Sequence, residues 1–271
     1  MLIDCFPYFN EREILELRIR TLENSVDGFL ITDANRTHRG EEKPFTCLET
    51  IRELGLPEEK IQVLHVELPP AEEAPDPWIR ERGQRDALGV GLHMLPDEAV
   101  FICSDCDEIA NPKRFEELLE VVKEEDDKVV RLSMSMHYGR ADRQLISPEG
   151  ELFDWRCGVV STVRKLKDFG TLSTMRATQH NRYFGTRDAG WHLSWMGDVD
   201  KRKTKLRSIA EYYIWDRPEV QKLCEDFKPE EGKTDMLGRE DHLLTSYPIE
   251  DLPEEAVKLE RVRKYLLPDG K

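Results

Sequence analysis

The sequence lacks any run of apolar residues long enough to cross a membrane. A membrane-spanning helix needs roughly 18 or more such residues in a row, and no segment of the 271-residue chain approaches this length. The first residues also lack the pattern of a secretory signal, because Met1 and two further apolar residues lead directly into Asp4. We therefore expect a cytoplasmic protein, attached to membranes at most peripherally, or a domain cut from a larger anchored protein.

The sequence also lacks an excess of positive charge. It has 55 acidic and 40 basic residues, which gives a formal net charge of −15 at pH 7. Such a surface repels the phosphates of nucleic acids, so nucleic acid is excluded as a partner. A small anionic ligand remains compatible with this charge where a few basic side chains and a cation surround it.

The six cysteines lack the paired spacing of a structural zinc site. Cys103 and Cys106 form one C-x-x-C, but no second pair of Cys or His follows at a comparable spacing. The cysteines are scattered along the chain, and several lie in apolar segments. We expect reduced and mostly buried thiols.

Apolar segments alternate with helical patterns through the first half of the chain. Residues 15, 19, 22 and 26 are apolar at helical spacing, and Asp76 followed by Pro77 is typical of a helix start. The segments expected to form strands are 1–6, 28–32, 61–68 and 99–103, and the expected helix after Pro77 covers 78–95. This order predicts an α/β fold, Rossmann-like, with a mostly parallel central sheet and helices on both faces.

The second half is less regular. It contains three further strand-like segments, at 128–138, 155–163 and 189–196, and a charged helical segment at 201–214. We find no internal repeat.

An acidic tripeptide, Asp105-Cys106-Asp107, follows the apolar segment 99–103. Ligands of parallel α/β sheets bind beyond the carboxyl ends of strands. Two aspartates one residue apart point to the same side of an extended chain, and carboxylate oxygens suit Mg²⁺ or Mn²⁺. The pattern therefore favours a site where a divalent ion bridges to substrate phosphates. An acidic loop that caps the next helix is the alternative.

Two other classes of enzyme combine acidic residues with such a strand, and the sequence lacks their further signatures. In a haloacid-dehalogenase phosphatase the first Asp is a nucleophile near the chain start, usually followed by Thr, whereas Glu108 and Ile109 follow here. A sugar-phosphate nucleotidyltransferase needs a Gly-rich loop after the first strand, where this chain has Phe6-Pro7-Tyr8-Phe9.

Five stretches of the chain match one known family in the expected order. They are Ile3-Asp4-Cys5-Phe6-Pro7-Tyr8-Phe9-Asn10-Glu11, Ala34-Asn35-Arg36-Thr37-His38, Gln84-Arg85-Asp86-Ala87, Ser104-Asp105-Cys106-Asp107-Glu108-Ile109 and Arg187-Asp188-Ala189-Gly190-Trp191-His192-Leu193-Ser194-Trp195. On these stretches the chain resembles glycosyltransferase family 17, typified by β-1,4-mannosyl-glycoprotein 4-β-N-acetylglucosaminyltransferase.

The resemblance implies a GT-A fold, a UDP-sugar donor such as UDP-GlcNAc, and inversion at the anomeric carbon. We expect one domain over residues 1–271, with a donor-binding half at 1–110, an acceptor-side half at 111–250 and a C-terminal tail at 251–271. The acceptor is expected to be a glycan or glycoconjugate. Animal members of the family carry a membrane anchor and act on protein N-glycans. Because we expect no anchor here, another glycan is an equally compatible acceptor.

A metal and a base are the catalytic groups that an inverting transferase of this family requires. We expect the metal, Mn²⁺ or Mg²⁺, on Asp105 and Asp107, with His192 as a nitrogen ligand. Asp188 is the expected base, because it follows Asp107 by 81 residues (188 − 107), within the range that the resemblance to inverting GT-A enzymes implies. In an extended segment Asp188 and His192 share a face, which would let His192 complete the metal site. Pairing of Asp188 with Arg187 and a structural role for His192 are the alternatives. Two further candidates for the base are Glu240 and Asp241.

Polar residues near the expected strand ends are candidates for donor binding. Two arginines three residues apart share one face of the helix at 78–95, and a basic run covers residues 201–207. The alternatives are that the two arginines form surface ion pairs and that the basic run is a solvated helix face. The candidates are Asn35, Arg36, His38, Arg82, Arg85, Asp105 and Lys205.

Three functions remain open on the sequence. The leading hypothesis is transfer of N-acetylglucosamine or a related sugar from UDP to a glycan hydroxyl. A metal-dependent phosphohydrolase would use the same tripeptide to cleave phosphate esters. A carbohydrate-binding protein of the same fold would bind glycan without catalysis.

Overall fold

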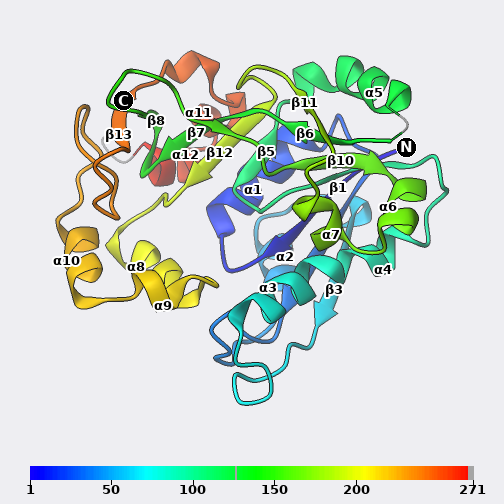
Figure 1. Ribbon diagram of the computed structural model, residues 1–271, viewed down its shortest axis with the longest axis horizontal. Coiled ribbons are helices and arrows are strands. Elements are labelled where there is room, and N and C mark those ends of the chain that lie inside the picture. The colour runs from blue at the N-terminus through cyan, green and yellow to red at the C-terminus, as the bar shows by residue number, and fades with distance from the viewer. Residues whose placement is uncertain (126, 268–271) are drawn as a thin grey trace.

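The computed structural model describes residues 1–125 and 127–267, and Figure 1 shows them as a ribbon. A seven-stranded sheet runs through this part of the chain. In spatial order its strands are β11 (Asn181–Phe184), β6 (Val129–Leu132), β10 (Val159–Thr162), β4 (Val100–Cys103), β1 (Leu2–Tyr8), β2 (Gly28–Ala34) and β3 (Ile61–Val66). Only β10 runs antiparallel to its neighbours in this sheet, so the sheet is mostly parallel, as the sequence predicts.

Strand β4 lies beside β1 in the middle of this sheet, and all four of its residues are buried. Its unbroken apolar sequence fits a strand that is covered on both faces. The register aligns Cys103 with Cys5. The acidic tripeptide follows β4 and therefore lies at the carboxyl edge of the sheet, where ligands of such folds bind.

A second sheet begins directly after the tripeptide. Its strands are β13 (Leu243–Ser246), β8 (Arg140–Ile146), β7 (Met134–Tyr138), β12 (Gly190–Ser194) and β5 (Glu108–Ala110) in spatial order, with β9 (Asp154–Trp155) paired to β7. Strands β5 and β12 are antiparallel, with Glu108 opposite His192. The tripeptide therefore connects the two sheets, and β12 carries His192 toward it.

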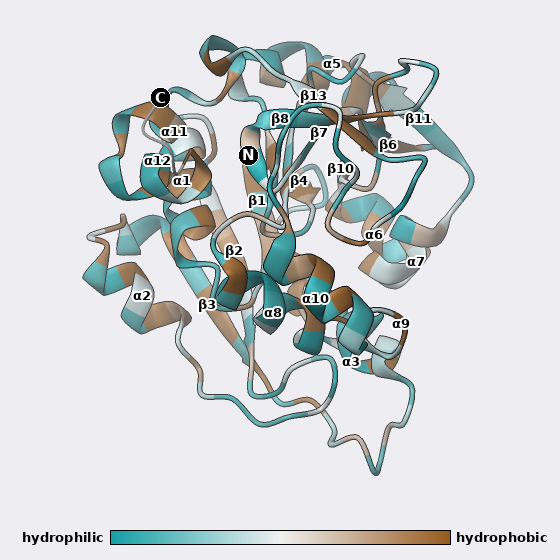
Figure 2. Cartoon of the chain, turned by 90° about the vertical axis from the view of Figure 1, so that its left-hand side faces the viewer, coloured by the Kyte–Doolittle hydropathy of each residue, from teal (hydrophilic) through white to brown (hydrophobic). Residues whose placement is uncertain are grey.

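Helices cover both faces of the central sheet, as Figure 2 shows with α1, α11 and α12 on one side and α6 and α7 on the other. The first group is α1 (Arg12–Leu22), α2 (Cys47–Glu53), α5 (Phe115–Glu124), α11 (Glu254–Lys258) and α12 (Glu260–Leu266). The second group is α3 (Pro77–Asp86), α4 (Leu88–Leu92), α6 (Val163–Phe169) and α7 (Leu172–Ala177). The remaining helices are α8 (Val199–Ser208), α9 (Tyr212–Trp215) and α10 (Pro218–Asp226), and short 3-10 turns lie at Glu58–Lys60, Pro112–Arg114 and Ile249–Asp251.

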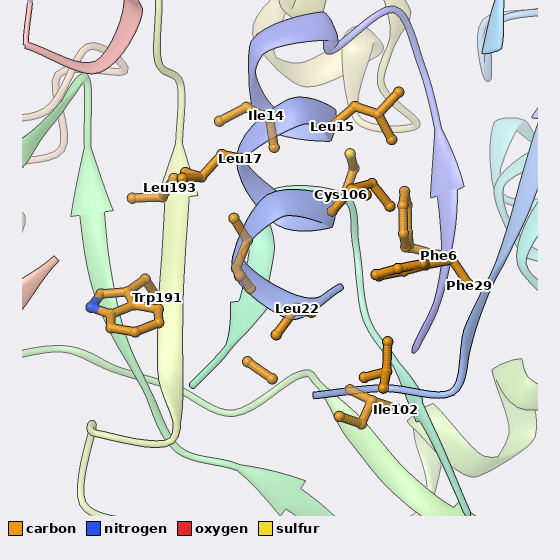
Figure 3. Close-up of a cluster of buried hydrophobic side chains, with 14 of the residues drawn as sticks. Phe6, Ile14, Leu15, Leu17, Leu22, Phe29, Ile102, Cys106, Trp191 and Leu193 are labelled. Atoms are coloured by element: carbon orange, nitrogen blue, oxygen red, sulfur yellow. The ribbon is translucent and has the colours of Figure 1, made fainter. Parts of the chain in front are cut away.

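Helix α1 is buried on two sides because it lies between the two sheets. Figure 3 shows Leu17 beside Leu193 of β12, and Leu15 on the side of Cys106 and Phe6. This double burial explains why apolar residues extend beyond one stripe of the helix. The packing fixes the start of α1 next to the tripeptide.

The predicted α/β class with helices on both faces is confirmed, and four expected elements are divided. The strand expected at 155–163 contains the end of β9, which pairs with β7 of the second sheet, and then β10 of the first. The helix expected at 78–95 is two helices that meet at Ala87, and the one expected at 201–214 ends at Ser208 before α9. The strand expected at 128–138 contributes β6 to one sheet and β7 to the other, with Ser133 between them. Among the described residues, no helix combines the length and apolarity that a membrane crossing requires.

Candidate active site

A buried arginine of α1 shapes the loop that carries the tripeptide. The Arg18 guanidinium contacts both Asp4 oxygens at 2.7 Å and donates to the backbone oxygens of Asp105 (2.6 Å) and Glu108 (3.0 Å) and to Ser104 Oγ (2.8 Å). Both charged side chains are fully buried. A buried charge is tolerated only when it is paired and hydrogen-bonded, so this pair depends on the folded loop and also fixes its shape.

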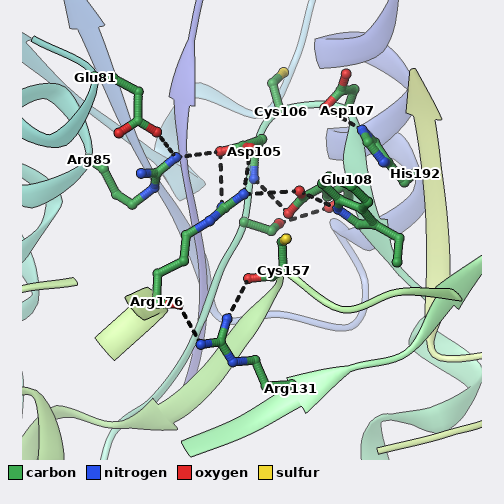
Figure 4. A network of polar contacts seen from close by, with 12 residues as sticks. Glu81, Arg85, Asp105, Cys106, Asp107, Glu108, Arg131, Cys157, Arg176 and His192 are labelled. Carbon is green, nitrogen blue, oxygen red and sulfur yellow. Dashed lines mark hydrogen bonds and ion pairs between the residues drawn. The ribbon is translucent and has the colours of Figure 1, made fainter. Parts of the chain in front are cut away.

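Two arginines, one from α3 and one from α7, hold the Asp105 carboxylate, as Figure 4 shows. Arg85 of α3 donates to Oδ1 at 2.9 Å, and Arg176 of α7 donates to both oxygens at 3.1 and 2.8 Å. Burial by itself would raise the pKa of Asp105, but Arg176 and Arg85 together lower this pKa well below its usual range. Asp105 is therefore ionised, and both of its oxygens are engaged.

Asp107 faces a different pair of side chains. Lys205 Nζ of α8 lies 2.7 Å from Oδ2, and His192 Nε2 of β12 lies 3.6 Å from Oδ1. Burial opposes ionisation, but Lys205 and His192 outweigh it and lower the pKa of Asp107 well below its usual range. The structure thus brings together three residues that the sequence assigns to the site, from three separate elements.

A cavity of about 340 Å³ opens beside Asp107, and we call it the Asp107 cavity. Glu11 lines it, directly before α1, together with Trp195 beyond the end of β12 and Lys205 of α8. Burial, and then the nearby Asp107, raises the pKa of Glu11 to about 7. The sequence reasoning missed Glu11, although it closes the first stretch on which the family resemblance rests.

The three candidate bases do not line the Asp107 cavity. Asp188 forms an ion pair with Arg114, its side chain is 51% exposed, and its backbone oxygen accepts from Asn111 Nδ2 at 3.0 Å. It precedes His192 by four residues and lies outside β12, which begins at Gly190. The alternative that Asp188 is paired is thus observed, with Arg114 in place of Arg187, and its role as the base stays a prediction. Asp241 is exposed and pairs with its neighbour His242, and Glu240 is also exposed.

The candidate donor-binding residues divide into two groups. His38 lies next to the site, with Nε2 3.2 Å from Gln84 Oε1, and burial lowers its pKa, so the ring is neutral. Asn35 accepts from the Leu68 amide at 2.9 Å, and Arg36 donates to Glu42 at 2.7 Å within its own loop. Arg82 is half exposed and pairs with Asp76 at 3.3 Å. In contrast to Arg85 and Lys205, these three residues hold loops and do not face the tripeptide.

The fit to a divalent metal is partial. Within the described ranges, no group of three or more His, Cys, Asp or Glu side chains is arranged to hold an ion. Asp107 Oδ1 and His192 Nε2 are close enough to bind one ion together, and an oxygen with an imidazole nitrogen suits Mn²⁺. Asp105 does not fit as a ligand in this arrangement, because Arg85 and Arg176 occupy both of its oxygens.

Comparison with known protein families decides the class of this molecule. The model of glycosyltransferase family 17 matches residues 1–269. The chain belongs to glycosyltransferase family 17. The resemblance seen in the sequence is thereby confirmed, and with it a glycosyltransferase function. The structure itself confirms the α/β fold with its mostly parallel central sheet.

Solved structures show weaker likenesses to this family 17 chain, and no curated protein matches it. Staphylococcus aureus TarS 1-349 in complex with UDP-GlcNAc is 12% identical, with 83% of this chain and 70% of TarS 1-349 covered and a TM-score of 0.43. A 4-diphosphocytidyl-2C-methyl-D-erythritol synthase is 9% identical over 67% and 87% of the two chains, with a TM-score of 0.41. Mannose-6-phosphate isomerase from Helicobacter pylori is 13% identical over 62% and 72%, with a TM-score of 0.41.

Proposed function

We propose that this family 17 member transfers N-acetylglucosamine, or a related sugar, from a UDP-sugar to a hydroxyl of a glycan or glycoconjugate, with inversion. The observation that carries the proposal is the cluster of cations around the tripeptide. Arg85, Arg176 and Lys205 come from three helices and converge on Asp105 and Asp107 at the carboxyl edge of β4.

The cation cluster suits a diphosphate. Negative charge on the diphosphate grows as its bond to the anomeric carbon breaks, so fixed positive groups stabilise the transition state more than the bound donor. Arg85 and Arg176 offer planar donors for phosphate oxygens, and Asp105 holds both guanidinium groups in place. A divalent ion held by Asp107 and His192 would supply further charge neutralisation of the leaving diphosphate.

The donor nucleotide is proposed from the family, and one feature of the site argues against the phosphohydrolase alternative. A phosphatase of the haloacid-dehalogenase type requires its first aspartate as a free nucleophile. Here that position is Asp105, whose oxygens accept from Arg85 and Arg176. A guanidinium-bound carboxylate is a poor nucleophile, because its lone pairs are engaged.

Release of UDP from a panel of donors tests the proposal. The protein is incubated with UDP-GlcNAc, UDP-galactose, UDP-glucose and GDP-mannose, with Mn²⁺ or with a chelator, and the free nucleoside diphosphate is measured. We expect slow hydrolysis of UDP-GlcNAc that requires the metal. Arg82→Gln is the matched control for Arg85→Gln, because both arginines lie on α3 and only Arg85 contacts Asp105. Turnover of GDP-mannose alone, or of no donor, would contradict the proposal.

A further inference from the structure

The Asp107 cavity differs in chemistry from the cation cluster around Asp105. Its volume of about 340 Å³ lies within the range of small-ligand sites, roughly 300–1,000 Å³. Phe9, Trp195 and Tyr265 contribute aromatic surface to its walls, and Glu11 and Asp198 contribute carboxylates. Aromatic faces pack on the apolar face of a sugar ring, and carboxylates accept hydrogen bonds from its hydroxyls.

The cations that line this cavity each contact another group of the protein. Lys205 pairs with Asp107 at 2.7 Å, Lys201 lies 3.9 Å from Glu13, and Arg202 donates to the Gly197 backbone oxygen at 2.9 Å. The aromatic and carboxylate walls suit a neutral ligand rich in hydroxyls, which is the chemistry of an acceptor sugar.

The backbone beyond β12 is strained where it forms the cavity wall. Trp195 has φ of 58°, a left-handed conformation that is strained for a bulky residue. Gly197 has φ of 89°, and a Cβ at this position would lie 2.5 Å from the Tyr265 ring. The tight bend brings the indole of Trp195 within 5.4 Å of Lys205 Nζ, measured from the ring centroid. Strain of this kind persists where surrounding contacts over-determine it, typically at ligand sites.

Among the carboxylates that line the cavity, Glu11 is the one that faces Asp107 and is partly shielded from solvent, whereas Asp198 and Asp200 are exposed. Asp107 is held by Lys205 and His192, and Asp198 caps α8 by accepting from the Lys201 amide at 2.9 Å. In the described part of the chain, Glu11 takes part in no ion pair. The start of α1 is fixed by packing between the two sheets, so the carboxylate is presented from a rigid element.

We propose that the Asp107 cavity is the acceptor subsite and that Glu11 is the catalytic base, an inference that rests on the proposed transferase function. The acceptor hydroxyl oxygen forms a bond to the anomeric carbon while the bond from that carbon to the diphosphate oxygen breaks. The bonding electron pair leaves with UDP, and the hydroxyl proton passes to the Glu11 carboxylate. In hydrolysis, water occupies the same place as the acceptor and loses its proton to the same group.

The test compares Glu11→Gln with Glu13→Gln in the metal-dependent hydrolysis of UDP-GlcNAc, which needs no identified acceptor. Both glutamates lie at the start of α1, but only Glu11 lines the cavity. We expect Glu11→Gln to lower kcat by about 100-fold or more, the usual contribution of a general base. Its affinity for UDP, measured by calorimetry, should stay within twofold of wild type, and Glu13→Gln should hydrolyse the donor at nearly the wild-type rate.

Two results would overturn the assignment of Glu11. One is a Glu11→Gln variant that hydrolyses UDP-GlcNAc within threefold of wild type. The other is a loss of UDP affinity that accounts for the whole loss of rate, because a base acts on kcat and not on donor binding. Both differ from failure of the proposed function itself, in which the wild-type protein hydrolyses no UDP-sugar.

Discussion

Arg18 contacts both oxygens of Asp4 at 2.7 Å, and the pair lies directly beneath the acidic tripeptide. The same guanidinium donates to the backbone oxygens of Asp105 and Glu108. One buried side chain therefore connects α1, β1 and the loop that leaves β4. The position of the carboxylates at the site depends on a contact that is not itself part of the chemistry.

Removal of either partner of this pair should destabilise the fold strongly. Arg18→Met leaves Asp4 as an uncompensated buried charge, which costs about 3–5 kcal/mol. Urea unfolding followed by circular dichroism measures the loss. The double variant Asp4→Leu/Arg18→Met should lose less than the sum of the two single variants, because no unpaired charge remains. Strictly additive losses would show that the two charges do not depend on each other.

Replacement of Arg176 should weaken donor binding without unfolding the protein. Arg176→Gln removes a guanidinium from Asp105 and from the proposed diphosphate subsite. A hydrogen bond to a charged group contributes roughly 1.5 kcal/mol or more, so we expect about a tenfold rise in the Kd for UDP by calorimetry. Arg164→Gln serves as the control, because Arg164 is exposed and pairs only with Glu98. Equal affinities in both variants would remove Arg176 from the site.

Asp188→Asn should leave the hydrolysis of UDP-GlcNAc within twofold of wild type. Asp188 is half exposed, pairs with Arg114 and does not line the Asp107 cavity. An exposed ion pair of this kind contributes up to about 1 kcal/mol, so the free energy of unfolding should change little. Kinetic assays on the folded variant check the prediction, and a 100-fold loss of kcat would return the role of base to Asp188.

Stability should fall as the pH drops below about 6.5, the ordinary pKa of His137 in the unfolded chain. Burial lowers its pKa to about 4 in the fold, where Nδ1 donates to the Ala141 backbone oxygen at 2.6 Å. The unfolded chain therefore binds one more proton between pH 6.5 and 4, which costs the folded state roughly 3 kcal/mol across that window. Urea midpoints at pH 7, 6 and 5 measure the trend. His137→Gln should flatten it, and an unchanged slope would contradict this assignment.

The position of the site could be predicted from the sequence, but several of its residues could not. An unbroken apolar segment marks a buried strand, and residues that follow such a strand lie at the ligand-binding edge. That reasoning places Asp105 and Asp107 at this edge, and the structure shows both directly after β4. Arg18, Arg176 and Glu11 reach the tripeptide only through tertiary packing, and no local pattern distinguishes them from other charged residues of the chain.

The case of Asp188 shows the limit of periodicity in a strand. Alternation predicts which residues share a face, and Asp188 and His192 satisfy it. It does not predict where the strand begins, and here β12 starts at Gly190, so Asp188 lies outside the strand that carries His192. Periodicity also does not predict where a helix is interrupted. The segment 78–95 has a continuous helical pattern, but α3 and α4 meet at Ala87.

Titration of UDP into the wild-type protein and into Asp107→Ala, each with and without Mn²⁺, tests the central claim most directly. If Asp107 and the cations around it form the donor site, Mn²⁺ should tighten UDP binding to the wild-type protein by at least about tenfold, or roughly 1.4 kcal/mol. The Asp107→Ala variant should lose this dependence on the metal. An affinity for UDP that ignores both Mn²⁺ and the substitution would contradict the account.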